Sequence, residues 1–119
     1  MTLSDKQHAF AKDFARLLSF LIENGVKFTL GEGHRPQILQ DIYFSEGASW
    51  TKHSLHTQKL AHDINFFLDG QYIGNMKPEE AKKRLQFIGD FWTSLSPENR
   101  WGGNHNPRQL DVPHFERRP

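Results

Sequence analysis

The sequence predicts an α+β fold, in which a small antiparallel sheet is flanked by helices. Two long segments repeat apolar residues at helical spacing, whereas the segments between and after them are short, alternate in polarity and are bounded by glycine or proline. A chain of 119 residues suits one domain and is long enough to bury a core without disulfides. We therefore expect residues 1–119 to form a single domain.

Three helices are expected along the chain. The first is predicted to begin near Ser4, which resembles the start of a capping box, and to end at Gly25. A short helix is expected after Pro36, and a long one from Pro78 to about Ser96, because proline suits the first turn of a helix. The apolar face of the first helix consists of Phe10, Ala11, Phe14, Leu17, Leu18, Leu21 and Ile22.

The strands are indicated by alternation and by turn residues. Residues 26–30 and 60–67 are predicted strands, and Asp69-Gly70 is a strong hairpin signal that leads into a strand at 71–73. Side chains alternate between the two faces of a strand, so Asp63 is expected on the face opposite His62. Residues 101–107 are expected to form a loop. Residues 111–116 are expected to be extended, because a proline in this segment disfavours helical angles before it.

Composition excludes several classes of protein. Cysteine is absent, so disulfides and thiolate metal sites are excluded, and a transition metal would need His, Asp or Glu ligands. Seven histidines are a first indication of such a metal. The net charge of +1 gives no basic field for nucleic acid. No apolar run approaches the ~20 residues of a membrane span, and the N-terminus lacks the pattern of a secretory signal.

His56 and Asp63 form a candidate site whose spacing by itself is weakly specific. Seven extended residues would separate them by ~23 Å, so a shared ion requires the chain to fold back, with His56 in a turn and Asp63 in the strand. A carboxylate within an apolar strand is costly unless it is paired.

A resemblance sharpens this hypothesis. The pattern Ser54-x-His56-x-x-Lys59-x-Ala61-x-Asp63 resembles the S-x-H-x-x-G-x-A-x-D motif of zinc peptidases of the D-alanyl-D-alanine carboxypeptidase and dipeptidase family. That family includes the L-alanyl-D-glutamate endopeptidases that phages use as endolysins. Lys59 stands where the family has glycine, so the turn between His56 and Asp63 must accommodate a side chain at this position.

Three further motifs follow the order of the family. They are G-H-R at 33–35, W-G-G at 101–103 and D-V-P-H at 111–114, and the resemblance extends over nearly the whole chain. Phage members often continue W-G-G with an acid and an aromatic residue, whereas this chain has Asn104 and His105.

The resemblance implies a role for each of five residues. His56, Asp63 and His114 would bind one zinc ion, which lowers the pKa of water and polarises a peptide carbonyl. Asp111 would accept the proton of the attacking water and pass it to the leaving amine. Arg35 would stabilise the oxyanion, because its guanidinium is a permanent cation. A His/His/Asp site could also accept other divalent ions.

Other residues have weaker or structural interpretations. Ser54 and His105 are candidate substrate-binding residues, although Ser54 could equally cap a turn and Arg35 could belong to a surface salt bridge. His34, His53 and His62 are expected to be non-ligands. Trp101 is expected to be a packing residue, and Trp50 could line the cleft or cover the core.

The function implied is that of a zinc metallopeptidase that hydrolyses peptidoglycan stem peptides at the L-alanyl-D-glutamate bond, as a phage or prophage endolysin. The alternatives are cleavage of D-Ala-D-Ala and a zinc-bearing peptidoglycan-binding module without turnover; a nuclease is disfavoured by the near-neutral charge. Such an endolysin is expected to be a monomer with no separate cell-wall-binding domain. We expect it to be made in the host cytoplasm without a signal peptide and to act on the wall after release.

Overall fold

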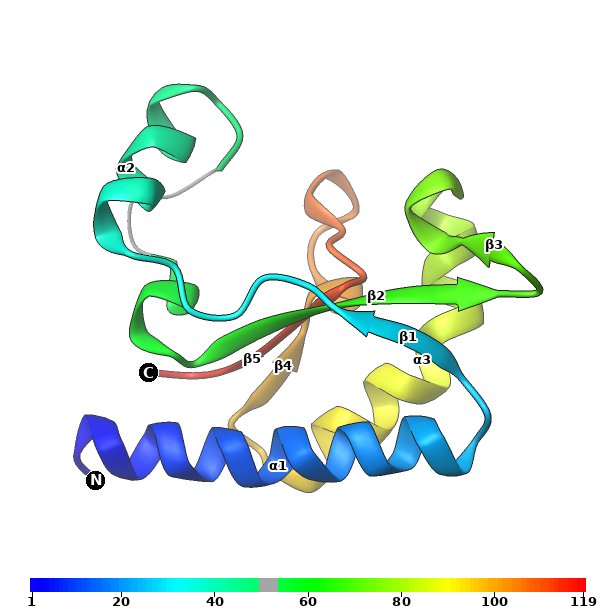
Figure 1. The fold of residues 1–119 in the computed structure, drawn as a ribbon, viewed down its shortest axis with the longest axis horizontal. Helices are drawn as coiled ribbons and strands as arrows, with labels where there is room; N and C mark the ends of the chain where they lie inside the picture. Colours follow the sequence, from blue (N-terminus) through cyan, green and yellow to red (C-terminus); the bar gives the residue numbers. More distant parts are fainter. Residues whose placement is uncertain (50–53) are drawn as a thin grey trace.

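The computed structural model describes residues 1–49 and 54–119, and its architecture is the predicted α+β fold (Figure 1). Three helices are present among these residues, and the rest of the regular structure is a small sheet with short 3-10 turns. The elements are α1 (Leu3–Glu23), β1 (Lys27–Leu30), α2 (Gln37–Ser45), β2 (Ala61–Leu68), β3 (Gln71–Tyr72), α3 (Pro78–Leu95), β4 (Asn99–Trp101) and β5 (His114–Arg117).

The sheet is built around β2, the longest strand. Its order is β1-β2-β5-β4 with antiparallel neighbours, and β3 returns along β2 through the predicted hairpin. Asp69 and Gly70 both have positive φ, of 51° and 76°, as a tight hairpin turn requires. Because β5 pairs with β2, the C-terminal end of the chain lies directly beside residues 61–63.

The two faces of the sheet have different roles. One face packs on α1 and α3, and His62 points to this side, where its ring stacks on Phe14 of α1 at 4.7 Å between centroids. The core between these layers contains Phe10, Leu17, Leu21, Ile64, Phe66, Leu85, Ile88, Trp92 and Phe115. Asp63 therefore faces the opposite side, as the alternation predicts, and α2 stands on that side in Figure 1.

Two boundaries differ from the sequence-based expectation. The cap of α1 is Thr2 rather than Ser4: the Thr2 side chain accepts from the Asp5 amide, and the Asp5 carboxylate accepts from the Thr2 amide. The expected loop at 101–107 overlaps a strand, β4, which is too short to show alternation in sequence. The strand forms because Trp101 is 1 % exposed and lies opposite Phe115 in the sheet.

No helix among residues 1–49 and 54–119 combines the length and apolar character needed to cross a bilayer.

The turn between His56 and Asp63 explains the position of the family glycine. Leu55–Gln58 form a 3-10 helix, and Lys59 closes it in the left-handed region, with φ 57° and ψ 35°. Glycine adopts this conformation without the steric cost that a side chain adds. The turn therefore forms with lysine at this position, but in a strained backbone.

Replacing Lys59 with glycine is expected to stabilise the protein. The left-handed backbone costs a residue with a Cβ atom about 1–2 kcal/mol, whereas glycine loses about 0.5–1 kcal/mol through the entropy of the unfolded chain. Lys59→Gly should therefore raise the free energy of unfolding, measured in urea, by up to about 1.5 kcal/mol. Lys59→Ala is the control, because it keeps the Cβ atom; a gain of equal size in both variants would contradict this explanation.

Candidate metal centre and active-site cleft

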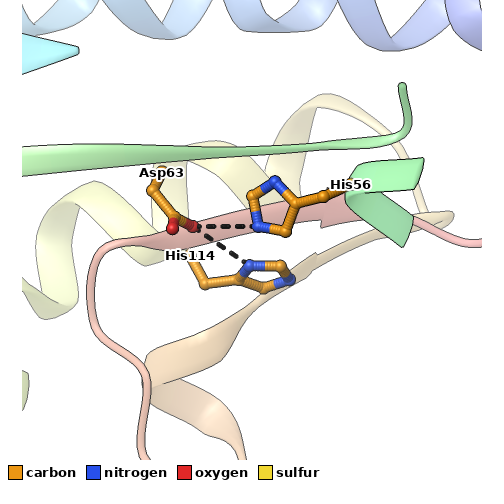
Figure 2. Close-up of side chains that lie close together, drawn as sticks. All are labelled: His56, Asp63 and His114. Carbon is orange, nitrogen blue, oxygen red and sulfur yellow. Dashed lines mark hydrogen bonds and ion pairs between the residues drawn. The ribbon is translucent and has the colours of Figure 1, made fainter. Parts of the chain in front are cut away.

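His56, Asp63 and His114 come from three separate elements and meet at one point (Figure 2). His56 lies in the 3-10 turn that precedes β2, Asp63 is the third residue of β2, and His114 is the first residue of β5. Asp63 and His114 are direct partners in the antiparallel pairing of β2 with β5. The sheet thus brings together residues that are far apart in the sequence.

Asp63 is the centre of this group. Its Oδ1 atom lies 3.3 Å from Nε2 of His56 and 3.2 Å from Nδ1 of His114, and Figure 2 shows both contacts as dashed lines. One ligand atom from each of the three residues lies within 4.8 Å of the others. Two imidazole nitrogens and a carboxylate oxygen at such distances can converge on one metal ion.

The remaining nitrogen of each histidine is also engaged. Nδ1 of His56 is 2.8 Å from the carbonyl oxygen of Gly33, and since a carbonyl only accepts, Nδ1 is the donor of this contact and Nε2 is the nitrogen that faces Asp63 and would bind a metal. Nε2 of His114 is 2.6 Å from Oε1 of Glu116, which leaves Nδ1 facing Asp63. This donor set fits a divalent metal that prefers nitrogen and oxygen ligands, zinc among them.

The charges in the cluster are strongly coupled. Burial acts to raise the pKa of Asp63, but hydrogen bonds from His114 and His56 outweigh it and hold that pKa well below its ordinary value. Burial acts to lower the pKa of His114, but its hydrogen bonds to Asp63 and Glu116 raise it to about 9. Protons therefore occupy the position between Asp63 and His114 at neutral pH unless a cation replaces them.

The metal-free protein is expected to lose stability as the pH rises from about 6.5 to about 9. A pKa of His114 raised from 6.5 to about 9 contributes stability that is complete below 6.5 and is lost as the pH rises through 9. The loss is at most about 3 kcal/mol. Thermal melts of chelator-treated protein at pH 6 and pH 9 measure it. The difference should be much smaller in His114→Gln, and a parent protein of equal stability at both pH values would contradict the prediction.

The W-G-G segment holds the second half of the site in place. The Trp101 indole donates to the carbonyl of Val112 at 2.8 Å, which confirms Trp101 as a packing residue. A Cβ atom on Gly102 would lie 2.0 Å from the carbonyl oxygen of Asp111 and 3.0 Å from the Cβ atom of His114. Glycine at 102 is therefore needed for the chain to approach Asp111 and His114 this closely.

Asp111 lines the same cavity as the metal-ligand candidates, and the cavity has a volume of about 580 Å³. Burial raises the pKa of the Asp111 carboxyl; the charge of His114 opposes this rise and that of Asp63 adds to it. A carboxyl that lies beside a metal position, with a pKa raised above its ordinary value, is suited to accept a proton and return it.

Arg35 forms a salt bridge, as its structural interpretation expected, but the residue is mostly buried rather than on the open surface. Its side chain is 11 % exposed and lies in the cavity wall, where it contacts Glu32 and Gln40. The guanidinium carbon also lies 4.9 Å from the centroid of the Tyr43 ring. A cation held from several sides is pre-organised for electrostatic stabilisation, although the salt bridge to Glu32 neutralises part of its charge.

The other predicted residues lie in or outside the cavity as follows. Ser54 lines it, and its hydroxyl caps the turn by accepting from the His56 amide at 3.2 Å, so the capping interpretation applies. His105 lines it as well, with its ring centroid 6.1 Å from that of His114. Among described residues, His34 and His62 are outside the metal-ligand group. Trp50 and His53 lie outside the described residues.

Sequence reasoning missed part of the cavity wall. Glu32, Arg100 and Glu116 all line it, and Gln40 contacts Arg35 from behind the wall. The signal for Glu116 was available, because residues two apart on a strand share a face and His114 was already a candidate. Glu32 and Gln40 gave no such signal, since their approach to Arg35 depends on the path of the loop before α2.

An α+β domain that gathers two histidines, an aspartate and a further acid in one cleft has the donor set of a metal-dependent hydrolase. The model of a peptidase family described as D-alanyl-D-alanine carboxypeptidase matches residues 46–117. The chain belongs to this peptidase family.

A comparison with solved structures gives the same fold. The L-Ala D-Glu endopeptidase ChiX of Serratia marcescens is similar to this chain, with a TM-score of 0.66 and 21 % sequence identity, over 96 % of this chain and 84 % of that chain. A comparison with curated proteins found no match.

Proposed function

We propose that the chain is a zinc peptidase that hydrolyses the L-alanyl-D-glutamate bond of peptidoglycan stem peptides, as a phage or prophage endolysin. The observation that carries the proposal is the convergence of His56, Asp63 and His114 beside Asp111 in one cavity. The choice of bond draws on the phage-like W-G-G and D-V-P-H-F segments and on the activity named for the similar structure.

His56 through Nε2, His114 through Nδ1 and Asp63 through Oδ1 would hold the zinc. Zinc supplies a Lewis acid that polarises the scissile carbonyl and makes water a better nucleophile. Three protein ligands are the number typical of catalytic zinc sites, which keep one position open.

The reaction steps assigned to the protein are proton transfer and charge stabilisation. The Asp111 carboxylate accepts a proton from the water as the water oxygen attacks the peptide carbonyl carbon. The same carboxyl then donates that proton to the nitrogen of the leaving amine. The Arg35 guanidinium, held by Glu32 and Gln40, offers donors to the negative charge that develops on the carbonyl oxygen.

Digestion of purified sacculi tests the activity and the bond together. Soluble products are analysed by mass spectrometry after incubation with the zinc-loaded protein. New peptides with N-terminal D-glutamate support the proposed bond, whereas release of free D-alanine supports the alternative that the family description names. Zinc-dependent binding to sacculi without any new terminus would instead identify a binding module and overturn the proposal.

Asp111 supports the enzyme over the binding module. A module that only binds does not require a partly buried carboxyl with a raised pKa next to the metal ligands, because withdrawing a carboxylate from water costs stability. The presence of such a group favours a site that turns over its substrate. In an endolysin this protein would be made in the host cytoplasm and would reach the wall after release.

A further inference from the structure

The two histidines of the cluster are held in different ways. His56 uses Nδ1 to donate to a neutral backbone carbonyl, that of Gly33, and directs Nε2 to Asp63. His114 is reversed: Nδ1 is directed to Asp63, and Nε2 lies 2.6 Å from the carboxylate of Glu116. The nitrogen of His114 that faces away from Asp63 therefore has a charged partner, whereas that of His56 has a neutral one.

Glu116 is placed by the sheet rather than by a flexible loop. It lies two residues after His114 on β5, so both side chains project from the same face of the strand. Its backbone is fixed from the core side, because the Trp92 indole approaches the Glu116 carbonyl at 3.2 Å. The residue is only 8 % exposed, which leaves its carboxylate little freedom to reach another partner.

The second oxygen of Glu116 is also engaged. Oε2 lies 2.5 Å from Nη2 of Arg100, its direct partner in the pairing of β4 with β5. Arg100 thus balances the charge of Glu116 and engages one carboxylate oxygen while the other meets His114. Arg100, Glu116 and His114 thus form a continuous chain of contacts.

The contact with Glu116 determines which nitrogen of His114 can act as a ligand. An ionised carboxylate only accepts hydrogen bonds, so Nε2 of His114 carries a proton and Nδ1 is left to coordinate. A carboxylate behind a ligand histidine also fixes the orientation of the ring and increases its basicity. The carbonyl behind His56 can orient the ring but adds no full charge.

We propose that Glu116 is a positioning residue that makes His114 an effective metal ligand. The inference rests on the proposed function, because it assumes that the cluster binds zinc. Loss of such a partner typically lowers metal affinity 10–100-fold. Glu116→Ala, which removes charge and hydrogen bond, is expected to weaken zinc binding within that range. Glu116→Gln keeps an acceptor oxygen and is expected to weaken binding less.

The test measures zinc affinity by competition with a chromophoric chelator, using the full chain at pH 7.5 and a temperature at which circular dichroism shows every variant folded. Glu79→Gln is the matched control, because Glu79 is exposed in the first turn of α3 and does not line the cavity. It should bind zinc as the parent does. A purely structural role of Glu116 would lower the melting temperature of the metal-free protein without a specific loss of zinc affinity in folded protein.

A second readout follows the ring itself. Nitrogen chemical shifts of the His114 imidazole in zinc-loaded protein report which nitrogen is protonated. The parent should show protonated Nε2 and coordinated Nδ1, and Glu116→Gln should shift the Nε2 resonance while the His56 resonances stay in place. If Glu116→Ala does not fold, Glu116→Gln decides the question through its affinity and this spectrum.

Parental zinc affinity together with an unchanged His114 spectrum in the folded Glu116 variants would overturn the inference and leave the proposed function intact. A parent protein that binds no zinc would overturn both.

Discussion

Asp111→Asn is expected to abolish peptidase activity while zinc binding remains. The amide cannot accept the proton of the attacking water, and the loss of a general base lowers the rate about 10²–10⁴-fold. The substitution also removes a partly buried carboxyl whose pKa is raised by desolvation, so the melting temperature should be unchanged or higher. Sacculus digestion rates, zinc stoichiometry and thermal melts provide the three measurements.

The control for Asp111 is Asp90→Asn, an exposed aspartate on α3 that does not line the cavity. It should keep the activity of the parent. If Asp111→Asn digests sacculi at the parental rate with zinc bound, Asp111 is not the proton acceptor. If Asp111→Asn loses zinc, the residue acts as a ligand, and the assignment of three ligands is wrong.

His56→Ala is expected to lose stoichiometric zinc and, with it, all activity. The substitution leaves only Asp63 and His114 as metal ligands. It also removes the hydrogen-bond donor of the Gly33 carbonyl. The side chain is 3 % exposed, so the protein should be destabilised by about 1–3 kcal/mol as well. Metal analysis after dialysis, with circular dichroism to show that the protein is folded, measures the effect.

His34→Ala provides the matched control for His56→Ala. His34 is exposed, lies on the loop before α2 and is not part of the ligand group. This variant should retain zinc and activity. Stoichiometric zinc in folded His56→Ala would show that His56 is not a ligand.

The sequence was informative where local patterns are strong. The alternation around Asp63 and the Asp69-Gly70 turn predicted β2 and its hairpin, and the structure confirms both. The same alternation placed His62 on the core side, where it stacks on Phe14. The meeting of His56, Asp63 and His114 followed from the motif resemblance, because spacing alone carries little information over such separations.

The features that were missed depend on contacts between distant segments. β4 has three residues, and only its pairing with β5 and the burial of Trp101 make it a strand. Glu32 lies near Asp63 because residues 31 and 32 continue the pairing of β1 with β2, in which the Gly31 amide donates to the Asp63 carbonyl at 2.9 Å and the Asp63 amide donates to the Glu32 carbonyl at 2.8 Å. The chain then turns before α2, and Arg35 meets the Glu32 carboxylate. Periodicity does not encode such approaches.

The pairing of β5 with β2 has a consequence for dynamics. His114 is held to Asp63 across these two strands, and Asp111 precedes the same strand, so one local unfolding event at β5 would dismantle the ligand set and displace the base together. A bound metal opposes that opening by mass action, by about 2.7 kcal/mol at a concentration 100 times the dissociation constant. Amide hydrogen exchange along β5 should therefore slow when zinc is added, and the rate of exchange there would report how much of the protein population is competent to react.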